Sequence, residues 1–193
     1  MSIEKDGNMI KNTIEHIITD RLIIRLAKPD DAEAIYAYRS DIVANKYQGW
    51  HPGSVEEVRD YIENMPQTMD VADICFQFAI ISTDEDCLIG DMGIIFTNHD
   101  RMQAEIGCTL NKNYQGNGYA SEALEGMVNY LFETLNKRRI ITSIDPRNVA
   151  SIRLVERLGF RKEAHFRESY YLRGEWVDDI IYAMLKKEWV KKI

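Results

Sequence analysis

The feature that most constrains the fold is a regular apolar repeat that follows a pair of glycines. Apolar side chains recur from Ala120 to Leu135 at the i, i+3, i+4, i+7 spacing of one helix face. This helix begins directly after Gly116 and Gly118, and residues 104–110 before it have the composition of a strand. A helix with one apolar face has to be covered by another layer of structure. The chain is therefore expected to pack a helix against a sheet.

The other periodic segments give a mixed α/β order of strands and helices. Strands are expected at residues 21–26, 76–82, 87–96, 104–110 and 139–144, with a closing hairpin at 160–171 and 176–185. Further helices are expected from about residue 30 to Lys46, from Ser54 to near Pro66, and from Asn148 to a C-cap at Gly159. Ser54 and Glu57 have the spacing of a capping box. The prediction is one domain at 19–193 after a leader at 1–18, which forms a frayed helix or an extra strand.

Length and charge exclude several classes of protein. The chain has 193 residues, with 24 Lys and Arg against 31 Asp and Glu, a net charge of −7. No general nucleic-acid binding is expected, because phosphate neutralisation needs a basic surface. No membrane attachment is expected, because no apolar stretch can span a bilayer and the first residues lack a signal-peptide pattern. Three widely spaced cysteines without zinc spacing favour free thiols, no metal and a cytoplasmic location.

The segment Gln115–Ala120 has the composition of an anion site. Its glycines let backbone N–H groups approach a ligand, and the helix start adds unpaired N–H groups with a partial positive charge. A Walker A loop is excluded because no Gly-Lys-Ser/Thr follows. The match to a dinucleotide-binding fingerprint is poor, because Ser121 stands where that fingerprint has its third glycine. A phosphate or pyrophosphate ligand is one interpretation. The other is a glycine-rich turn before an ordinary helix.

Three motifs stand in a fixed order along the chain. They are Gln115-x-x-Gly118-x-Ala120, then Asn148-x-x-Ser151 followed by Gly159-Phe160, and finally Gly174-x-Trp176-x-Asp178. In this order they resemble the GNAT family, the GCN5-related N-acetyltransferases. Within that family they are similar to the branch of the ribosomal-protein N-terminal acetyltransferases (RimJ/RimL-like).

The resemblance implies a fold and an activity that composition alone does not reveal. The fold is a mixed α/β arrangement, with a mostly antiparallel twisted sheet splayed between its fourth and fifth strands and helices on both faces. The implied activity is acetyl-CoA-dependent transfer to a primary amine, by direct attack in a ternary complex. The implied acceptor is a small-molecule amine or a protein N-terminus, and the implied assembly is a monomer or a homodimer.

The resemblance also implies which residues bind acetyl-CoA. The expected contacts come from the fourth strand, the glycine loop and the start of the later helix: Cys108, Thr109, Leu110, Gln115, Gly116, Asn117, Gly118, Tyr119, Ala120, Ser121, Asn148 and Ser151. Cations for the CoA phosphates stay unassigned among Arg161, Lys162, Arg167 and residues 186–192.

The candidate base is Glu105. Alternation along the strand places Glu105 and Gly107 on the face opposite Ile106, and the small Gly107 leaves room for a ligand there. Glu105 would remove the proton of the acceptor ammonium, because only the free amine attacks, and it would also contact the acceptor. The alternative is an ordinary solvated carboxylate.

The group that assists the leaving thiolate is less defined. Many family members have Tyr where this chain has Val155, so Ser151 is the candidate hydrogen-bond donor, with Tyr170 as another. Ser151 could equally satisfy the backbone at the helix start. An acyl-enzyme on Cys108 is disfavoured, because no activating His or Lys is adjacent and alternation places it on the packed face.

Tyr47 and Trp50, in the loop after the first helix, could line an amine pocket, or they could simply pack on the sheet. Two other function classes stay open. One is a non-catalytic acyl-CoA sensor or binding module, and the other is a nucleotide-binding protein that uses the same glycines.

Overall fold

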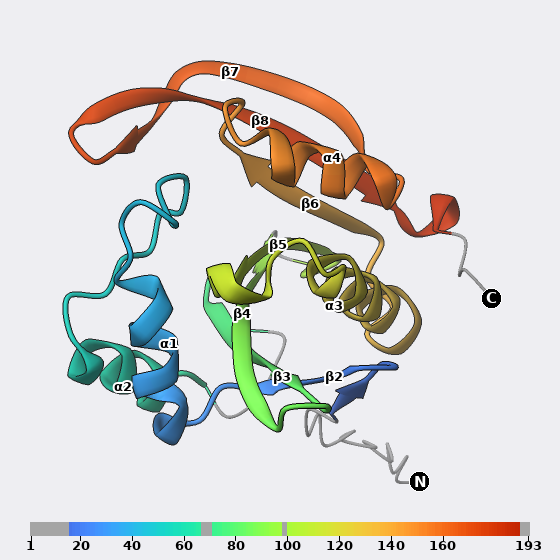
Figure 1. The fold of residues 1–193 in the computed structure, drawn as a ribbon. Helices are drawn as coiled ribbons and strands as arrows, with labels where there is room; N and C mark the ends of the chain where they lie inside the picture. Colours follow the sequence, from blue (N-terminus) through green and yellow to red (C-terminus); the bar gives the residue numbers. More distant parts are fainter. Residues whose placement is uncertain (1–15, 67–70, 98–99, 190–193) are drawn as a thin grey trace, which may run out of the picture.

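The computed structural model describes residues 16–66, 71–97 and 100–189. These residues form an eight-stranded sheet in the order β1-β2-β3-β4-β5-β6-β8-β7 (Figure 1). The strands are β1 Ile17–Ile18, β2 Leu22–Leu26, β3 Cys75–Ser82, β4 Cys87–Thr97, β5 Gln103–Leu110, β6 Arg139–Ile144, β7 Arg161–Leu172 and β8 Glu175–Leu185. Every neighbouring pair is antiparallel except β5 with β6, so the predicted mixed, mostly antiparallel sheet is confirmed.

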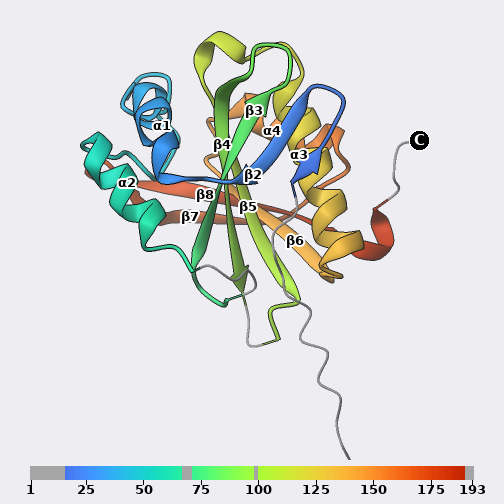
Figure 2. The same cartoon turned by 90° about the horizontal axis from the view of Figure 1, so that it is seen from below.

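Four α-helices lie on the two faces of the sheet (Figures 1 and 2). They are α1 Ala32–Arg39, α2 Val55–Glu63, α3 Tyr119–Asn129 and α4 Val149–Arg157. The predicted repeat of α3 is confirmed, because Leu124, Met127 and Val128 are buried in the main core together with Ile106 of β5. The last part of that repeat, Tyr130–Thr134, is a π-helical turn. Helices α1 and α2 share a second, smaller core on the other face of the sheet.

The sheet opens between β5 and β6. Their parallel pairing runs only from Gln103↔Arg139 to Glu105↔Ile141, whereas β5 continues to Leu110 and β6 to Ile144. Residues 106–110 of β5 stay paired with β4 on their other side. The predicted splay between the fourth and fifth strands, counted from residue 21, lies here. It leaves one backbone edge of β5 turned toward a gap rather than toward a strand.

The first helix ends earlier than the sequence suggested. It stops at Arg39, not near Lys46, and turns follow. The Asp41 carboxylate accepts the backbone N–H groups of Val43 and Ala44, at 3.2 and 3.1 Å, and the Asn45 amide donates to the Tyr38 carbonyl at 2.6 Å. These side-chain bonds compete with helical ones, which is why the helix does not continue.

Two further boundary predictions are refined. The Ser54 hydroxyl accepts the Glu57 N–H at 3.2 Å as expected, but the Glu57 carboxylate takes the N–H of Gly53 at 2.7 Å. The helix that follows ends at Glu63. In the leader, Ile17–Ile18 is an extra strand paired with β2, and the rest of that prediction, at 1–15, lies outside the described residues.

The closing hairpin is confirmed, and its end extends past the sheet. Arg173 and Gly174 form the two-residue turn, with φ of +51° and +90°, as a tight hairpin requires. Strand β8 pairs with β6 only from Ile180 onward, so residues 170–179 form a two-stranded arm beyond the sheet (Figure 1). No helix within residues 16–66, 71–97 and 100–189 combines the length and apolar character needed to cross a bilayer.

Candidate active site

Three adjoining cavities follow the opening between β5 and β6. The glycine-loop cavity, about 530 Å³, lies beside the start of α3, and the sheet-face cavity, about 410 Å³, lies on the face away from α3. A smaller junction cavity of about 80 Å³ shares wall residues with both. Tyr47 and Gln48 line all three. The opening of the sheet is therefore lined by three adjoining cavities, from one face of the sheet to the other.

The glycine loop needs its glycines for conformation. Gly116 and Gly118 have φ of +81° and +86°, a region in which a side chain is strained. Gly118 is also the N-cap of α3, so the unpaired N–H groups of the first turn face the glycine-loop cavity. The segment is therefore shaped for an anion, as its composition suggested.

The start of α3 is held from strand β2. Arg21 donates from Nη1 to the Asn117 carbonyl at 3.1 Å and from Nε to the Glu122 carboxylate at 2.7 Å. Thr19 donates to the same carboxylate at 2.6 Å. Burial opposes ionisation of Glu122, but these hydrogen bonds outweigh it and lower its pKa. The glycine loop is thus fixed by a neighbouring strand that is distant in sequence.

Eleven of the twelve residues predicted to bind acetyl-CoA line the glycine-loop cavity. They are Cys108, Thr109, Leu110, Gln115, Gly116, Gly118, Tyr119, Ala120, Ser121, Asn148 and Ser151. Asn117 is not on the wall, and its carbonyl accepts from Arg21 instead.

The cations on that wall differ from those considered in the sequence. Lys46 and Arg157 line the cavity, and Arg157 Nη2 donates to the Ser121 hydroxyl at 3.1 Å. Arg161 pairs with Glu163 and Glu188, and Lys186 donates to the Asn136 side chain at 2.9 Å. Neither Arg161 nor Lys186 lines the cavity. Arg157 carries no motif signal, and only the packing of α4 beside α3 brings it here.

The junction cavity brings Ser151, Cys108 and Gly107 together. The Ser151 backbone N–H donates to the Asn148 side chain at 3.3 Å, so Asn148 is the N-cap of α4. Open space surrounds the position where a Cβ of Gly107 would stand. Val155, in the place of the family's usual Tyr, is buried on the wall.

Cys108 is a neutral thiol in this environment. Burial, with a further contribution from the Asp91 charge, raises the pKa of Cys108 to about 12. The thiolate is the nucleophilic form of cysteine, so this environment disfavours an acyl-cysteine route. The Arg39 charge acts in the opposite direction, but burial and the Asp91 charge outweigh it.

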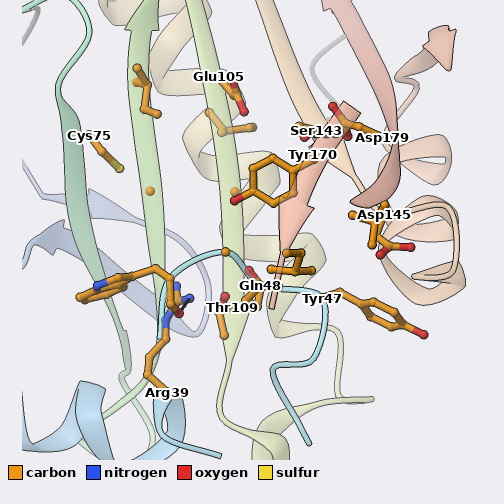
Figure 3. A pocket seen from close by; sticks show the side chains of 18 of the residues that line it. Arg39, Tyr47, Gln48, Cys75, Glu105, Thr109, Ser143, Asp145, Tyr170 and Asp179 are labelled. Atoms are coloured by element: carbon orange, nitrogen blue, oxygen red, sulfur yellow. Dashed lines mark hydrogen bonds between the residues drawn. The ribbon is translucent and has the colours of Figure 1, made fainter. Parts of the chain in front are cut away.

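The sheet-face cavity holds Glu105, Asp179 and Tyr170 (Figure 3). Glu105 lies on the face away from α3, as strand alternation predicted. Burial raises the pKa of Glu105, and the nearby Asp179 charge raises it further. Asp179 Oδ1 accepts a hydrogen bond from the Ser143 hydroxyl at 2.7 Å. The site thus holds a carboxylate that is a stronger base than an exposed Glu.

The floor of this cavity rests on a buried ion pair that the sequence did not reveal. Asp91 is fully buried and accepts from Arg39 Nη2 at 2.5 Å, from the Tyr38 hydroxyl at 2.5 Å, and from Gln77. The Arg39 guanidinium lies 5.1 Å from the centroid of the Trp50 ring. The only available signal was a lone Asp inside an apolar strand.

The two loop aromatics of the acceptor prediction, Tyr47 and Trp50, both line the sheet-face cavity. Trp50 packs against Tyr61 in a tilted arrangement with ring centroids 5.2 Å apart, and Tyr61 lines the same cavity. The Tyr170 hydroxyl lies against Gly49, so the arm and the loop meet there. Tyr171 does not line the cavity, and it is 59% exposed.

Comparison of the sequence with known proteins finds N-acetyltransferases of one family. Residues 21–161 match the family model of the acetyltransferase (GNAT) domain. The uncharacterized N-acetyltransferase YnaD of Bacillus subtilis is 35% identical over 90% of this chain and 99% of its own length. The ribosomal protein uS5-alanine N-acetyltransferase of Escherichia coli is 27% identical over 90% of this chain and 92% of its length.

Solved structures have the same fold. A GNAT-family acetyltransferase from Bacillus anthracis aligns with a TM-score of 0.80 and 30% identity, over 90% of this chain and all of that chain. The spermidine N-acetyltransferase of Vibrio cholerae, in complex with CoA and spermine, aligns with a TM-score of 0.76 at 21% identity, over 88% of this chain and 98% of that chain. At that identity the second match shows the fold alone.

Proposed function

This chain belongs to the GNAT family of acetyltransferases, and from that premise we propose that it moves an acetyl group from acetyl-CoA directly to a primary amine. The observation that carries the proposal is the row of three adjoining cavities across the opened sheet. One end offers backbone N–H groups and two cations, and the other offers carboxylates. An anionic donor and a cationic acceptor can therefore bind at once and meet in the middle.

The donor is assigned to the glycine-loop cavity. The start of α3, with Lys46 and Arg157, fits the pyrophosphate, because these groups supply N–H donors and positive charge. The backbone edge of β5 at Cys108–Leu110 has no partner strand, although the Leu110 carbonyl accepts from Gln115 Nε2 at 3.1 Å. This edge fits the amide-bearing pantetheine arm, which can hydrogen-bond to its remaining groups as a further strand does. The thioester then lies at the junction cavity.

The chemistry follows from the groups around the junction. Glu105 takes the proton of the acceptor ammonium, directly or through a water, and the free amine attacks the thioester carbonyl. A backbone N–H of β5 stabilises the oxyanion, and the carbon–sulfur bond then breaks. The nitrogen that has attacked carries a surplus proton, which passes to the departing thiolate and gives CoA. Ser151, on the junction cavity, and Tyr170, on the sheet-face cavity, are the candidates that hydrogen-bond to this thiolate. Cys108 takes no covalent part.

Tyr47, Trp50 and Glu105 are assigned to the acceptor. The acceptor class is either a small amine or a protein N-terminus, since an E. coli relative acts on a ribosomal protein alanine and a structural neighbour binds spermine. A reaction that draws on acetyl-CoA, together with three free cysteines, supports a cytoplasmic location.

One observation favours a second candidate, a non-catalytic acyl-CoA sensor. Val155 cannot donate a proton, so the chain lacks the acid that many relatives have at this position. Donor binding without transfer is what such a module would show.

Two measurements test the proposal. Acetyl-CoA should raise the melting temperature, and NAD or ATP should not, because a ligand stabilises only the folded state that binds it. CoA release should then be followed with a panel of peptides and small amines, for the parent protein and for Glu105→Gln. Glu33→Gln is the matched control, because Glu33 is exposed on α1, away from the cavities.

The outcomes separate the candidates. Stabilisation by acetyl-CoA with no CoA release on any amine would identify the sensor. Stabilisation by NAD or ATP, and none by acetyl-CoA, would refute both. Equal losses of rate in the Glu105 and Glu33 variants would remove Glu105 from the mechanism.

A further inference from the structure

The ionisable groups around the sheet-face cavity are unevenly paired. Arg39 is saturated by Asp91, and Asp145 is paired with Arg147 at 2.7 Å. Asp178 accepts from His165 at 2.7 Å and from the Glu168 N–H at 2.9 Å. Each of these wall groups is therefore already neutralised or hydrogen-bonded within the chain.

Glu105 and Asp179 are different. Neither has a salt bridge to Lys, Arg or His within the described residues. Among the residues that the structure describes, the Asp179 carboxylate accepts from the neutral Ser143 hydroxyl, which orients it without compensating its charge. Burial and the Asp179 charge both disfavour ionisation of Glu105, and neither carboxylate is paired with a cation there, so the cavity is complementary to positive charge.

A second observation also points to a bound ligand. Thr109 is only 5% exposed and lines both larger cavities (Figure 3). Its hydroxyl oxygen is buried and has no hydrogen-bond partner in the part of the chain that the structure describes. Buried hydroxyls are normally hydrogen-bonded, so Thr109 leaves an unmet polar group beside these two cavities.

The remaining wall is aromatic. Trp50, Tyr61 and Tyr170 line the same cavity as the two carboxylates. Such rings suit an apolar chain or a cation over their faces. The volume, about 410 Å³, is in the range of small-molecule sites.

We propose that the acceptor is a small primary amine that carries a second cationic group and no carboxylate, with that second cation held by Asp179. This inference rests on the proposed acetyl transfer. The reacting ammonium loses its proton to Glu105, so it cannot also neutralise Asp179 during the reaction. A second cation on the same molecule does so throughout. An acceptor carboxylate finds no free cation on these walls, because Arg39 is already saturated.

The contacts around the cavity favour a small molecule over a polypeptide. Arg173, at the tip of the β7–β8 arm, donates to the carbonyls of Ile42 and Asn45 at 3.1 and 3.0 Å. Arm and loop form two of the cavity walls, and these bonds tie them together. A peptide N-terminus also brings only one assured charge. It would leave Asp179 uncompensated.

Three acceptors of equal chain length test the proposal: 1,4-diaminobutane, pentylamine and 5-aminopentanoate. They present the same reacting amine and differ only in a distal ammonium, methyl or carboxylate group. The diamine should have kcat/KM at least about tenfold above pentylamine, chiefly through KM, and 5-aminopentanoate should be the poorest. An alanine-initiated peptide is the fourth arm.

Asp179→Asn should remove the diamine preference by lowering kcat/KM for the diamine about tenfold or more, to the level of pentylamine measured with the same variant. Thermal melting of the variant beside the parent checks that it is folded. The acid limb of the pentylamine pH profile should move to lower pH, because Asp179 raises the pKa of Glu105. A merely structural role for Asp179 would not move that limb. Asp60→Asn, exposed on α2, is the control.

Failure of the diamine inference can be distinguished from failure of the proposed acetyl transfer. Equal kcat/KM for diamine and pentylamine, a better peptide substrate, or a preference that survives in Asp179→Asn would overturn the diamine inference alone. No CoA release with any of the four acceptors would refute the acetyl transfer itself, and the inference with it.

Discussion

Replacing Asp91 with Asn should destabilise the protein strongly. Asp91 is 0% exposed, and the side chain of its partner Arg39 is 7% exposed. An Asn side chain of the same shape offers one oxygen instead of a carboxylate and turns an NH2 group toward donors. The Arg39 charge then stays buried without compensation. Breaking a buried pair in this way costs about 3–5 kcal/mol, out of a typical stability of roughly 5–15 kcal/mol.

The assay is urea denaturation at pH 7, with thermal melting beside it. For a chain of this size each kcal/mol shifts the melting temperature by about 2–4 °C, so the variant should melt roughly 6–20 °C lower. Asp60→Asn, a surface change of the same chemistry, should stay within about 0.5 kcal/mol. A loss below about 1 kcal/mol in Asp91→Asn would refute the reasoning.

A double variant separates charge from packing. Arg39→Met with Asp91→Leu removes both ions, and apolar replacement of a buried pair is often neutral or stabilising. It should therefore recover part of the stability lost in Asp91→Asn, limited by the hydroxyl of Tyr38 and the amide of Gln77, which lose their acceptor.

Three further outcomes are expected. Gly118→Ala should cost about 1–2 kcal/mol, because φ is +86°, and it should weaken stabilisation by acetyl-CoA in a thermal-shift titration. Cys108→Ala should keep most activity, since its thiol is protonated at neutral pH, and a burst of protein-bound acetate lost in the variant would contradict this. Glu105→Gln should lower kcat/KM by roughly 10²–10⁴-fold. Because the pKa of Glu105 is raised, parent activity should fall as pH drops through a value above 4.5, and the pH profile of the variant should lack that limb.

The parts that could be predicted from the sequence are those that local chemistry decides. The apolar repeat of α3 fixes which face is buried, whatever covers it. The positive φ of Gly116 and Gly118 is a backbone requirement that few residues other than glycine meet. Alternation along β5 likewise assigned Glu105 to its face without knowledge of what lies opposite.

The parts that could not be predicted depend on contacts across the fold. Asp179 and Glu105 are 74 positions apart in the sequence, and only the pairing of β6 with β8 brings them to one cavity. The end of α1 depended on whether Asp41 and Asn45 would bond to nearby backbone, which helix periodicity does not report. Arg157 and Lys46 reach the glycine-loop cavity from elements with no shared motif.

The charges of the chain are unevenly distributed around the opening of the sheet. A net charge of −7 describes the whole chain, but the row of cavities across the sheet is polarised along its length. Backbone N–H groups, Lys46 and Arg157 occupy one end, and the carboxylates of Glu105 and Asp179 occupy the other. Under the proposed acetyl transfer, this separation of charge directs an anionic donor to one side of the sheet and a cationic acceptor to the other, an arrangement that net charge alone does not predict.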